Sequence, residues 1–405
     1  MVTNDATRPR FPAVQTPGAH YESYYLKAVH PDGGLGVWVR HTIQKAPGQP
    51  PVGSLWCTLF DAKRGGPLAG RSTLDPQALA VTGEGHLRLG DAVFAPGVVE
   101  GSAEVAPAPA GRSWRRRAPQ PAAPAAKQPH GFADQTRPDQ TRPDPAGPDP
   151  AGPDQAGSPT GSGSHPADDG DGDTRARSRP GVRWRLRHLP GEPPLWHLPR
   201  LWMYRSALPR TKLLSITPRT RVSGEVEVDG QVIRLDGWPG MVGHNWGVQH
   251  AERWIWLHCA GFDDRPEDWL DVSLGRVRLG RWTTPWVANG VLSVDGHRIR
   301  LGGPQRVQNT VVDESRLSCH VELPGDDLSV RIDVGAPPER FVGWQYADPD
   351  GGLPHDTTNC SIADLTLTLI RGGKQDRLVA TGTATYELGG RDQPAEIAIE
   401  PYGAL

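Results

Sequence analysis

The sequence predicts an all-β fold with enough strands for two barrels or sandwiches. Outside one internal segment, apolar and polar residues alternate with the period of two that is typical of extended strands. Two Asp-Gly pairs lie between such alternating runs, and this is the strongest short-range signal for a hairpin. The sequence carries no amphipathic helical pattern of about ten or more residues.

The first expected strands lie near the N-terminus. Leu35–Gln44 and Gly53–Asp61 are two β-rich runs, and a Pro/Gly turn joins them. Beyond the internal segment, Val182, Trp184 and Leu186 alternate with three arginines. In an extended strand the three apolar side chains share one face and the arginines share the other. We therefore expect this strand to have one face in water.

The Asp-Gly pairs predict two hairpins further along the chain. Asp229 and Asp295 are each followed by glycine between alternating runs. Both residues of such a turn must tolerate a positive φ, which favours this pair. The Thr- and Leu-rich runs Cys360–Arg371 and Arg377–Leu388 predict two more strands.

The internal segment Ala103–Pro180 differs from the rest in composition. It consists mainly of Pro, Ala, Gly, Asp and Arg and has almost no aliphatic side chains. It holds 15 of the 42 prolines in the 405 residues. Such a segment cannot bury enough apolar area to offset the entropy lost on ordering the chain. We therefore expect a disordered insertion.

Charge and cysteine content exclude several classes of protein. The formal net charge is −2 at pH 7, which gives no broad cationic surface for nucleic acid or for an anionic membrane. No apolar run approaches the ~18 residues of a membrane-spanning helix, and the first residues lack the apolar core of a signal peptide. The four cysteines lie far apart, as reduced thiols do. We expect a cytoplasmic protein with no nucleic-acid partner and no integral membrane segment.

The familiar catalytic motifs are absent from the sequence. It contains no dinucleotide-binding glycine motif after a strand, no phosphate-binding loop, no nucleophile elbow and no zinc-protease motif. A dense block of aromatic and polar residues between Leu235 and Asp271 remains as the candidate site.

This block brings an acid close to tryptophans. Along extended strands, Trp254, Trp256 and His258 share one face, and Trp269 and Asp271 share a face of the next run. A carboxyl group among tryptophans would have a raised pKa, which a proton donor needs. The alternative is that Asp271 is hydrogen-bonded at a barrel rim and that the tryptophans are core residues.

The histidines of the block allow a second interpretation. His244 and Trp246 point the same way on one strand, but a single histidine in this position is more often structural. His244, His250 and His258 together suggest a metal site, yet their spacing scatters them over two strands. We therefore expect no metal.

Several segments, in order along the chain, resemble a known family. They are His20–Lys27, Tyr204–Ser206, Val222–Gly230, Trp238–Gly247, Trp254–Trp256 and Tyr386–Gly389. They resemble the two-domain lipocalin-like family that includes carotenoid 1,2-hydratase (hydroxyneurosporene synthase), the AttH-like proteins, tocopherol cyclase and fungal Diels–Alder cyclases. The resemblance covers most of the chain outside residues 103–180.

The resemblance implies two packed lipocalin-like β-barrels, at residues 11–250 and 251–401, with residues 103–180 as a long disordered loop of the first. It also implies a site lined by a His-x-Trp pair and an aromatic-x-Asp pair. His244 and Trp246 match the first pair. Trp269 and Asp271 are the nearest candidates for the second, although Trp stands where Tyr is expected.

The candidate residues fall into two groups, an expected catalytic pair and an expected set of ligand contacts. Asp271 and His244 are expected to be catalytic, without any cofactor. The residues expected to contact an apolar ligand are Trp246, Trp254, Trp256, His258, Trp269, Tyr25 and Glu22.

Two classes of function follow for a terpenoid- or polyketide-like ligand. In a hydratase or cyclase, Asp271 would protonate an alkene, tryptophan faces would stabilise the cation, and His244 would orient water or take back the proton. A cyclase could also act mainly by folding a polyene. The second class is a non-catalytic carrier, because a barrel cavity suits an apolar ligand without an acid. A carboxylate buried in the cavity beside Trp and His would favour the enzyme.

Overall fold

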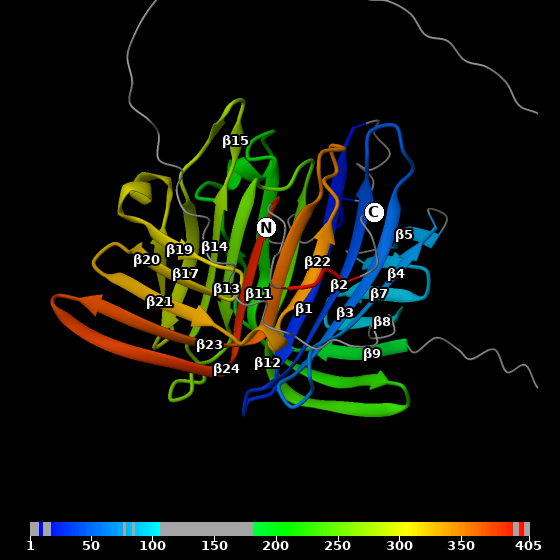
Figure 1. The fold of residues 1–405 in the computed structure, drawn as a ribbon, viewed down its shortest axis with the longest axis horizontal. Coiled ribbons are helices and arrows are strands. Elements are labelled where there is room, and N and C mark those ends of the chain that lie inside the picture. Colours follow the sequence, from blue (N-terminus) through cyan, green and yellow to red (C-terminus); the bar gives the residue numbers. More distant parts are fainter. Residues whose placement is uncertain are drawn as a thin grey trace, which may run out of the picture. The chain divides into compact units, whose positions relative to one another are not determined.

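The computed structural model describes residues 8–10, 18–75, 78–82, 86–105, 181–391 and 397–400. Antiparallel strands, nearly all of them in two large sheets, make up most of these residues (Figure 1). The helices named within this part of the chain are short 3₁₀ turns, η3 (Leu201–Tyr204), η4 (Pro304–Asn309) and η5 (Pro338–Arg340). The all-β prediction is confirmed.

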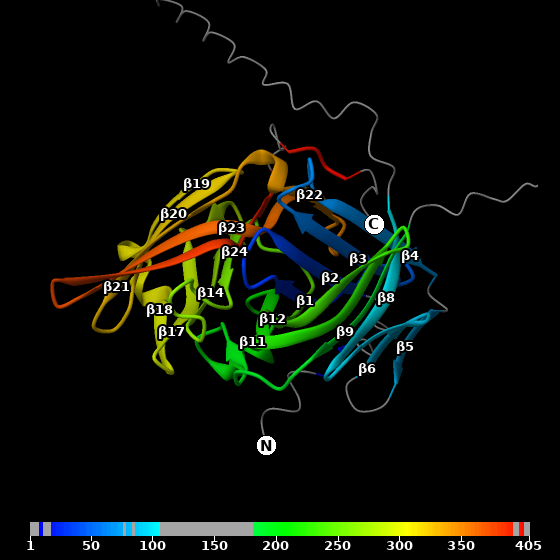
Figure 2. The same cartoon turned by 90° about the horizontal axis from the view of Figure 1, so that it is seen from below.

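Sheet A has 12 strands in the order β4-β3-β2-β1-β12-β11-β9-β8-β7-β6-β5, with β10 paired to β11. The strands are β1 (His20–Val29), β2 (Leu35–Lys45), β3 (Val52–Asp61), β4 (Leu68–Leu74), β5 (Leu79–Thr82), β6 (His86–Leu89), β7 (Ala92–Ala95), β8 (Val98–Glu104), β9 (Gly181–His188), β10 (Leu195–Trp196), β11 (Thr211–Val228) and β12 (Gln231–Gly247). They curve around a common interior (Figure 2). A bridge from Gly70 of β4 to Val105 after β8 makes sheet A a nearly closed barrel.

Sheet B has 10 strands in the order β18-β17-β14-β13-β24-β23-β21-β20-β19, with β22 paired to β23. The strands are β13 (Arg253–Cys259), β14 (Trp269–Arg276), β17 (Val287–Val294), β18 (His297–Gly302), β19 (Val311–Glu314), β20 (Ser318–Pro324), β21 (Ser329–Gly335), β22 (Val342–Tyr346), β23 (His355–Arg371) and β24 (Lys374–Gly390). A small hairpin of β15 (Arg278–Leu279) and β16 (Trp282–Thr283) stands apart. Sheet B is a half-barrel rather than a second closed barrel, because its edge strands β18 and β19 are not paired in the described part of the chain.

The local patterns explain the individual elements. The apolar face of β9 is buried and its three arginines are exposed, as the alternation predicts. At both predicted hairpins the turn residues have positive φ, with Asp229 at 49° and Asp295 at 51°. These turns connect β11 to β12 and β17 to β18, so the two hairpins lie in different sheets.

Strands β1 to β3 are buried on both faces, because they lie between the barrel interior and sheet B. One face fills the barrel with residues such as Leu26, Val39 and Leu59. The opposite face packs on sheet B, where Trp56 lies 5.0 Å from Trp344 between ring centroids. Sheet A therefore has an apolar interior and a second apolar surface against sheet B.

The predicted disordered insertion is described only at its first residues. Ala103 and Glu104 belong to β8 and Val105 forms the bridge, so these three residues are part of sheet A. Residues 106–180 lie outside the described residues. Among the residues that the structure does describe, no helix is long and apolar enough to cross a membrane.

Candidate functional site

A cavity of about 280 Å³ lies between sheets A and B. Its volume is just below the roughly 300 Å³ at which pockets for drug-sized molecules begin. Much of its wall is aromatic or aliphatic, from Tyr21, Tyr25, Trp38, Leu213, Trp254, Ile255, Trp256, Leu274 and Tyr346. The cavity therefore suits a small, largely apolar molecule.

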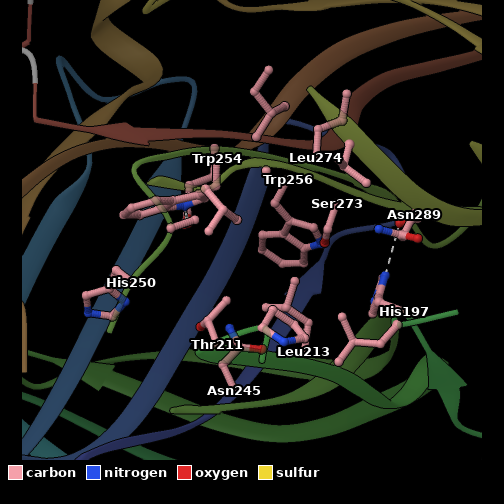
Figure 3. Close-up of a pocket in the computed structure, with 18 of the residues that line it drawn as sticks. His197, Thr211, Leu213, Asn245, His250, Trp254, Trp256, Ser273, Leu274 and Asn289 are labelled. Carbon is pink, nitrogen blue, oxygen red and sulfur yellow. Dashed lines mark hydrogen bonds between the residues drawn. The ribbon is translucent and has the colours of Figure 1, made fainter. Parts of the chain in front are cut away.

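Strand register explains the sheet B wall. Glu387 of β24 lies opposite Trp256 of β13, which lies opposite Ser273 of β14, which in turn lies opposite Asn289 of β17. Directly opposed residues share a face, and all four line the cavity. Figure 3 shows Trp256 and Ser273 facing the Leu213 side of the cavity.

Glu387 places a carboxyl group in this wall. Trp254 Nε1 donates a hydrogen bond to its Oε1 and Asn359 Nδ2 donates one to its Oε2, each at 2.9 Å. Burial raises the pKa of Glu387, and it outweighs the opposing effects of the Trp254 bond, the positive charge of Arg40 and the Asn359 bond. Glu387 is thus a buried acid that holds its proton more firmly than an ordinary glutamate.

Arg40 of β2 brings a guanidinium group to the opposite side of the cavity. It is buried, its Nε donates to Ser23 Oγ at 2.6 Å, and its Cζ lies 4.4 Å from the ring centroid of Tyr346. These contacts fix a positive charge in a mostly aromatic wall. A polar group of a bound ligand would find a donor there.

Asp271 is also buried, but it lies behind the wall rather than in it. Its Oδ1 accepts from Trp256 Nε1 at 3.1 Å, and its Oδ2 accepts from Ser215 Oγ. Burial raises its pKa, but His197, His258 and the Ser215 bond together lower it further, so the net shift is downward. The predicted raised pKa of Asp271 is therefore wrong, because imidazole groups and a hydroxyl stabilise its carboxylate.

His197, which follows β10, connects Asp271 to the cavity. Its Nδ1 lies 3.2 Å from the backbone oxygen of Asn289 (Figure 3). Its Nε2 lies 3.1 Å from Ser215 Oγ and 3.7 Å from Asp271 Oδ2. A carbonyl oxygen only accepts, so Nδ1 carries a proton. Because Ser215 donates its proton to Asp271, Nε2 meets an acceptor as well. Each ring nitrogen of His197 therefore lies beside an oxygen that accepts a hydrogen bond.

His244 and Glu22 form a separate buried pair. His244 Nε2 donates to Glu22 Oε1 at 2.8 Å, and the backbone N–H of Arg10 donates to both Glu22 oxygens at 2.7 and 2.8 Å. The ring of Tyr24 is stacked on His244 with 4.0 Å between centroids. Neighbouring Asn245 lines the cavity, so alternation turns His244 to the other face of β12. The structure does not bring His244 and Asp271 together.

Trp246 follows His244 rather than the cavity. Its ring lies 4.5 Å from that of His244, and it packs with Tyr204 and Leu214. Tyr25, in contrast, lines the cavity, and its ring lies edge-on to Trp256 at 5.5 Å. Of the predicted ligand contacts, Tyr25, Trp254 and Trp256 line the cavity.

His258 and Trp269 lie in the packed interior outside the cavity wall. His258 Nε2 donates to the Pro218 oxygen at 2.8 Å, and burial lowers its pKa to about 4. Trp269 packs with Leu195 and Val291. His258 and Trp269 lie two residues from Trp256 and Asp271 in the sequence, but neither of them lines the cavity.

The sequence argument missed four polar residues of the cavity wall, Glu387, Arg40, His197 and Asn289. Glu387 had a detectable signal, since it is the charged residue of the Tyr386–Gly389 motif. His197 had none, because it follows a two-residue strand. Within the described residues, no group of three or more His, Cys, Asp or Glu side chains has the arrangement of a metal site.

Comparison with known proteins yields distant relatives. No protein-family model matches the chain. Two Mycobacterium tuberculosis proteins, "Uncharacterized protein MT0513" from strain CDC 1551 / Oshkosh and "Uncharacterized protein Rv0493c" from strain ATCC 25618 / H37Rv, are each 30% identical to it over 225 residues. The match covers 53% of this chain and 63% of each relative, which is less than two thirds of their length.

Two solved structures are similar to this one. An AttH-like protein from Nitrosomonas europaea has a TM-score of 0.47 at 12% identity, with 96% of both chains covered. Kievitone hydratase from Nectria haematococca has a TM-score of 0.40 at 8% identity, with 96% of this chain and 91% of the other covered. At these scores, no residue role is transferred from either protein.

Proposed function

We propose that the protein is a cofactor-independent hydratase or cyclase that acts on a small apolar molecule of terpenoid or polyketide type in the cavity between the sheets. The observation that carries the proposal is Glu387, a buried carboxyl group with a raised pKa in an aromatic wall. A simple carrier has no need of such a group, because burying an ionisable side chain without a task only costs stability.

The chemistry follows from the residues around Glu387. The protonated carboxyl would transfer its proton to an alkene carbon, so an O–H bond breaks, a C–H bond forms and a carbocation remains. A water oxygen, or a hydroxyl of the same substrate, would then bond to the cationic carbon and release a proton. That proton returns to the Glu387 carboxylate, so the cycle needs no other reactant.

The cavity wall would stabilise the intermediate cation. Trp254, Trp256 and Tyr25 present aromatic rings beside Glu387, and ring faces attract a desolvated cation. The Trp254 and Asn359 hydrogen bonds hold the carboxyl group in one orientation. Proton transfer depends on such a fixed geometry.

Asp271 has a positioning role in this proposal. Its carboxylate accepts a hydrogen bond from the Trp256 indole N–H and lies 3.7 Å from His197 Nε2, and both of these residues line the cavity. The earlier assignment of Asp271 as proton donor remains open to direct test by substitution.

The test uses the isotopic composition of water. The protein is incubated with an apolar extract of its own host in water enriched in the heavy oxygen isotope, and products are followed by mass spectrometry. A hydratase gives a product heavier than its substrate by one labelled water, and a cyclase gives an unlabelled isomer. We expect Glu387→Gln to retain bound ligand and to form neither product. Retention of ligand with no product from the wild type would contradict the proposal and favour a carrier.

A further inference from the structure

Two segments that border the cavity also carry large apolar side chains on their outer surface. The first segment is 197–210, which contains η3. Its cavity side is formed by Leu198, Pro199, Met203 and Pro209. On its outer side Leu201, Trp202 and Leu208 are 52%, 63% and 58% exposed. A cluster of large exposed apolar side chains is typical of a surface that binds another molecule.

The second segment is 277–284, which contains the β15–β16 hairpin labelled at one end of sheet B in Figure 1. Val277 and Thr284 line the cavity at its base. Trp282 near its tip is 69% exposed. Two exposed tryptophans therefore lie on the two segments that border one cavity, and we call segments 197–210 and 277–284 together the cavity rim.

All the charged side chains in the two segments of the cavity rim, apart from histidine, are arginines. Its arginines are Arg200, Arg205, Arg210, Arg278 and Arg281, and neither segment contains an aspartate or a glutamate. Glu252 pairs with Arg278 from a neighbouring segment at 2.8 Å, which neutralises one of these charges. The Arg281 guanidinium lies 5.2 Å from the ring centroid of Trp282. The rim is thus both apolar and cationic, in a chain whose net charge is −2.

We propose that the cavity rim docks on the surface of an anionic lipid bilayer, so that an apolar substrate passes between the bilayer and the cavity. This inference rests on the proposed function for the apolar nature of the substrate. Tryptophan partitions to the boundary between lipid headgroups and acyl chains, and arginine is attracted to anionic headgroups. The rim presents both residue types next to the cavity.

A second copy of the chain fits the rim less well. In a symmetric dimer the same surface meets itself, so the arginines of one copy would face those of the other. Like charges placed opposite one another weaken such a contact. An anionic bilayer instead offers charge of the opposite sign together with an apolar layer.

The experiment measures sedimentation of the full chain with vesicles, with no substrate present. One set of vesicles contains phosphatidylglycerol and phosphatidylcholine, and the other contains phosphatidylcholine alone. We expect binding to the anionic set and weaker binding as salt is added, because salt screens the arginines. Arg200→Gln, Arg210→Gln and Arg281→Gln together should weaken binding about a hundredfold, and Trp202→Ala with Trp282→Ala about tenfold.

Control variants replace exposed arginines and exposed apolar residues outside the rim. Arg183→Gln, Arg185→Gln and Arg187→Gln remove three exposed arginines of β9, and Val232→Ala with Val311→Ala remove exposed apolar side chains outside the rim. These variants should bind anionic vesicles as the wild type does.

Several results would overturn the docking surface. They are no binding to anionic vesicles, equal binding to neutral vesicles, equal weakening by rim and control variants, or a rim-dependent dimer that leaves vesicle binding unchanged. Because vesicle binding is measured without turnover, a protein that converts substrate in detergent but binds no vesicles loses only this inference.

Discussion

Asp271 and Glu387 are two buried carboxyl groups of sheet B, and their environments differ in one important respect. Each accepts a hydrogen bond from a tryptophan N–H, at 3.1 Å for Asp271 and 2.9 Å for Glu387. Asp271 also has the imidazole of His197 at 3.7 Å, whereas the second donor to Glu387 is the neutral amide of Asn359. The pKa of Asp271 is lowered and that of Glu387 is raised.

The comparison shows that burial beside tryptophan does not by itself make a proton donor. Burial raises the pKa of both groups, and the sign of the net shift depends on which cations and donors reach each carboxylate. Asp271 is surrounded by groups that stabilise its anion. Around Glu387 the effect of burial outweighs that of its two hydrogen bonds and of Arg40, so it keeps its proton more readily, which is the property that general acid catalysis needs.

The largest expected effect is on turnover. Glu387→Gln keeps the size of the side chain but removes its proton, so kcat should fall by about 100-fold or more while ligand binding persists. Asp271→Asn should lower kcat by less than about tenfold, because it disturbs only the positions of Trp256 and His197. Steady-state kinetics on the identified substrate measures both. A larger loss in Asp271→Asn, in protein that is fully folded, would return the role of proton donor to Asp271.

The next effect is on stability. Asp271→Asn removes the partner of His197, and losing one member of a buried pair costs about 4 kcal/mol. The folded-state pKa of Asp271 lies below its ordinary 3.8, so this contribution is present above that pH and is lost as the pH falls through the folded pKa. Urea unfolding at several pH values measures it. Equal stability of wild type and variant at neutral pH would show that the pair is not stabilising.

Lys27 extends the comparison to a buried cation without a carboxylate contact in the described residues. Its Nζ donates to the Thr383 oxygen and to His258 Nδ1, each at 3.4 Å, and burial lowers its pKa from 10.5 to about 8. Between these values the unfolded chain binds more protons than the folded chain, so stability should rise with pH by up to about 3 kcal/mol.

Lys27→Met should remove that rise, and Lys374→Met, at an exposed position, should keep it. Unfolding free energies measured from pH 8 to 10.5 test the difference. If the unfolding free energy rises equally with pH in wild type and Lys27→Met, Lys27 does not lose its proton on folding in this pH range.

The smallest effect sharpens the description of Glu387. The Trp254 hydrogen bond lowers the pKa of Glu387, so Trp254→Phe should raise it further. Because turnover needs the protonated acid, the basic limb of the pH–rate profile should move to higher pH. Trp256→Phe leaves the Glu387 hydrogen bonds in place and serves as the control. If the basic limb is unchanged in Trp254→Phe, the titration of Glu387 does not cause that limb.

The sequence by itself determined the strands and their turns. Alternation is local, so it placed Val182, Trp184 and Leu186 on one buried face, and the Asp229 and Asp295 turns follow from the positive φ that a two-residue hairpin requires. Tyr25, Trp254 and Trp256 were predicted to contact a ligand, and they line the cavity. The strands, the turns and the two tryptophans needed only local sequence patterns, whereas Tyr25 came from the family resemblance.

Only the tertiary structure decided which face of each strand meets the cavity and which acid is positioned to donate a proton. Alternation shows that His244 and Asn245 point to opposite faces of β12, but not which face meets sheet B. The carboxyl group of the cavity wall comes from β24, and the imidazole beside Asp271 comes from the segment after β10. A pKa depends on groups within a few ångströms, and those groups come from strands that the sequence separates widely.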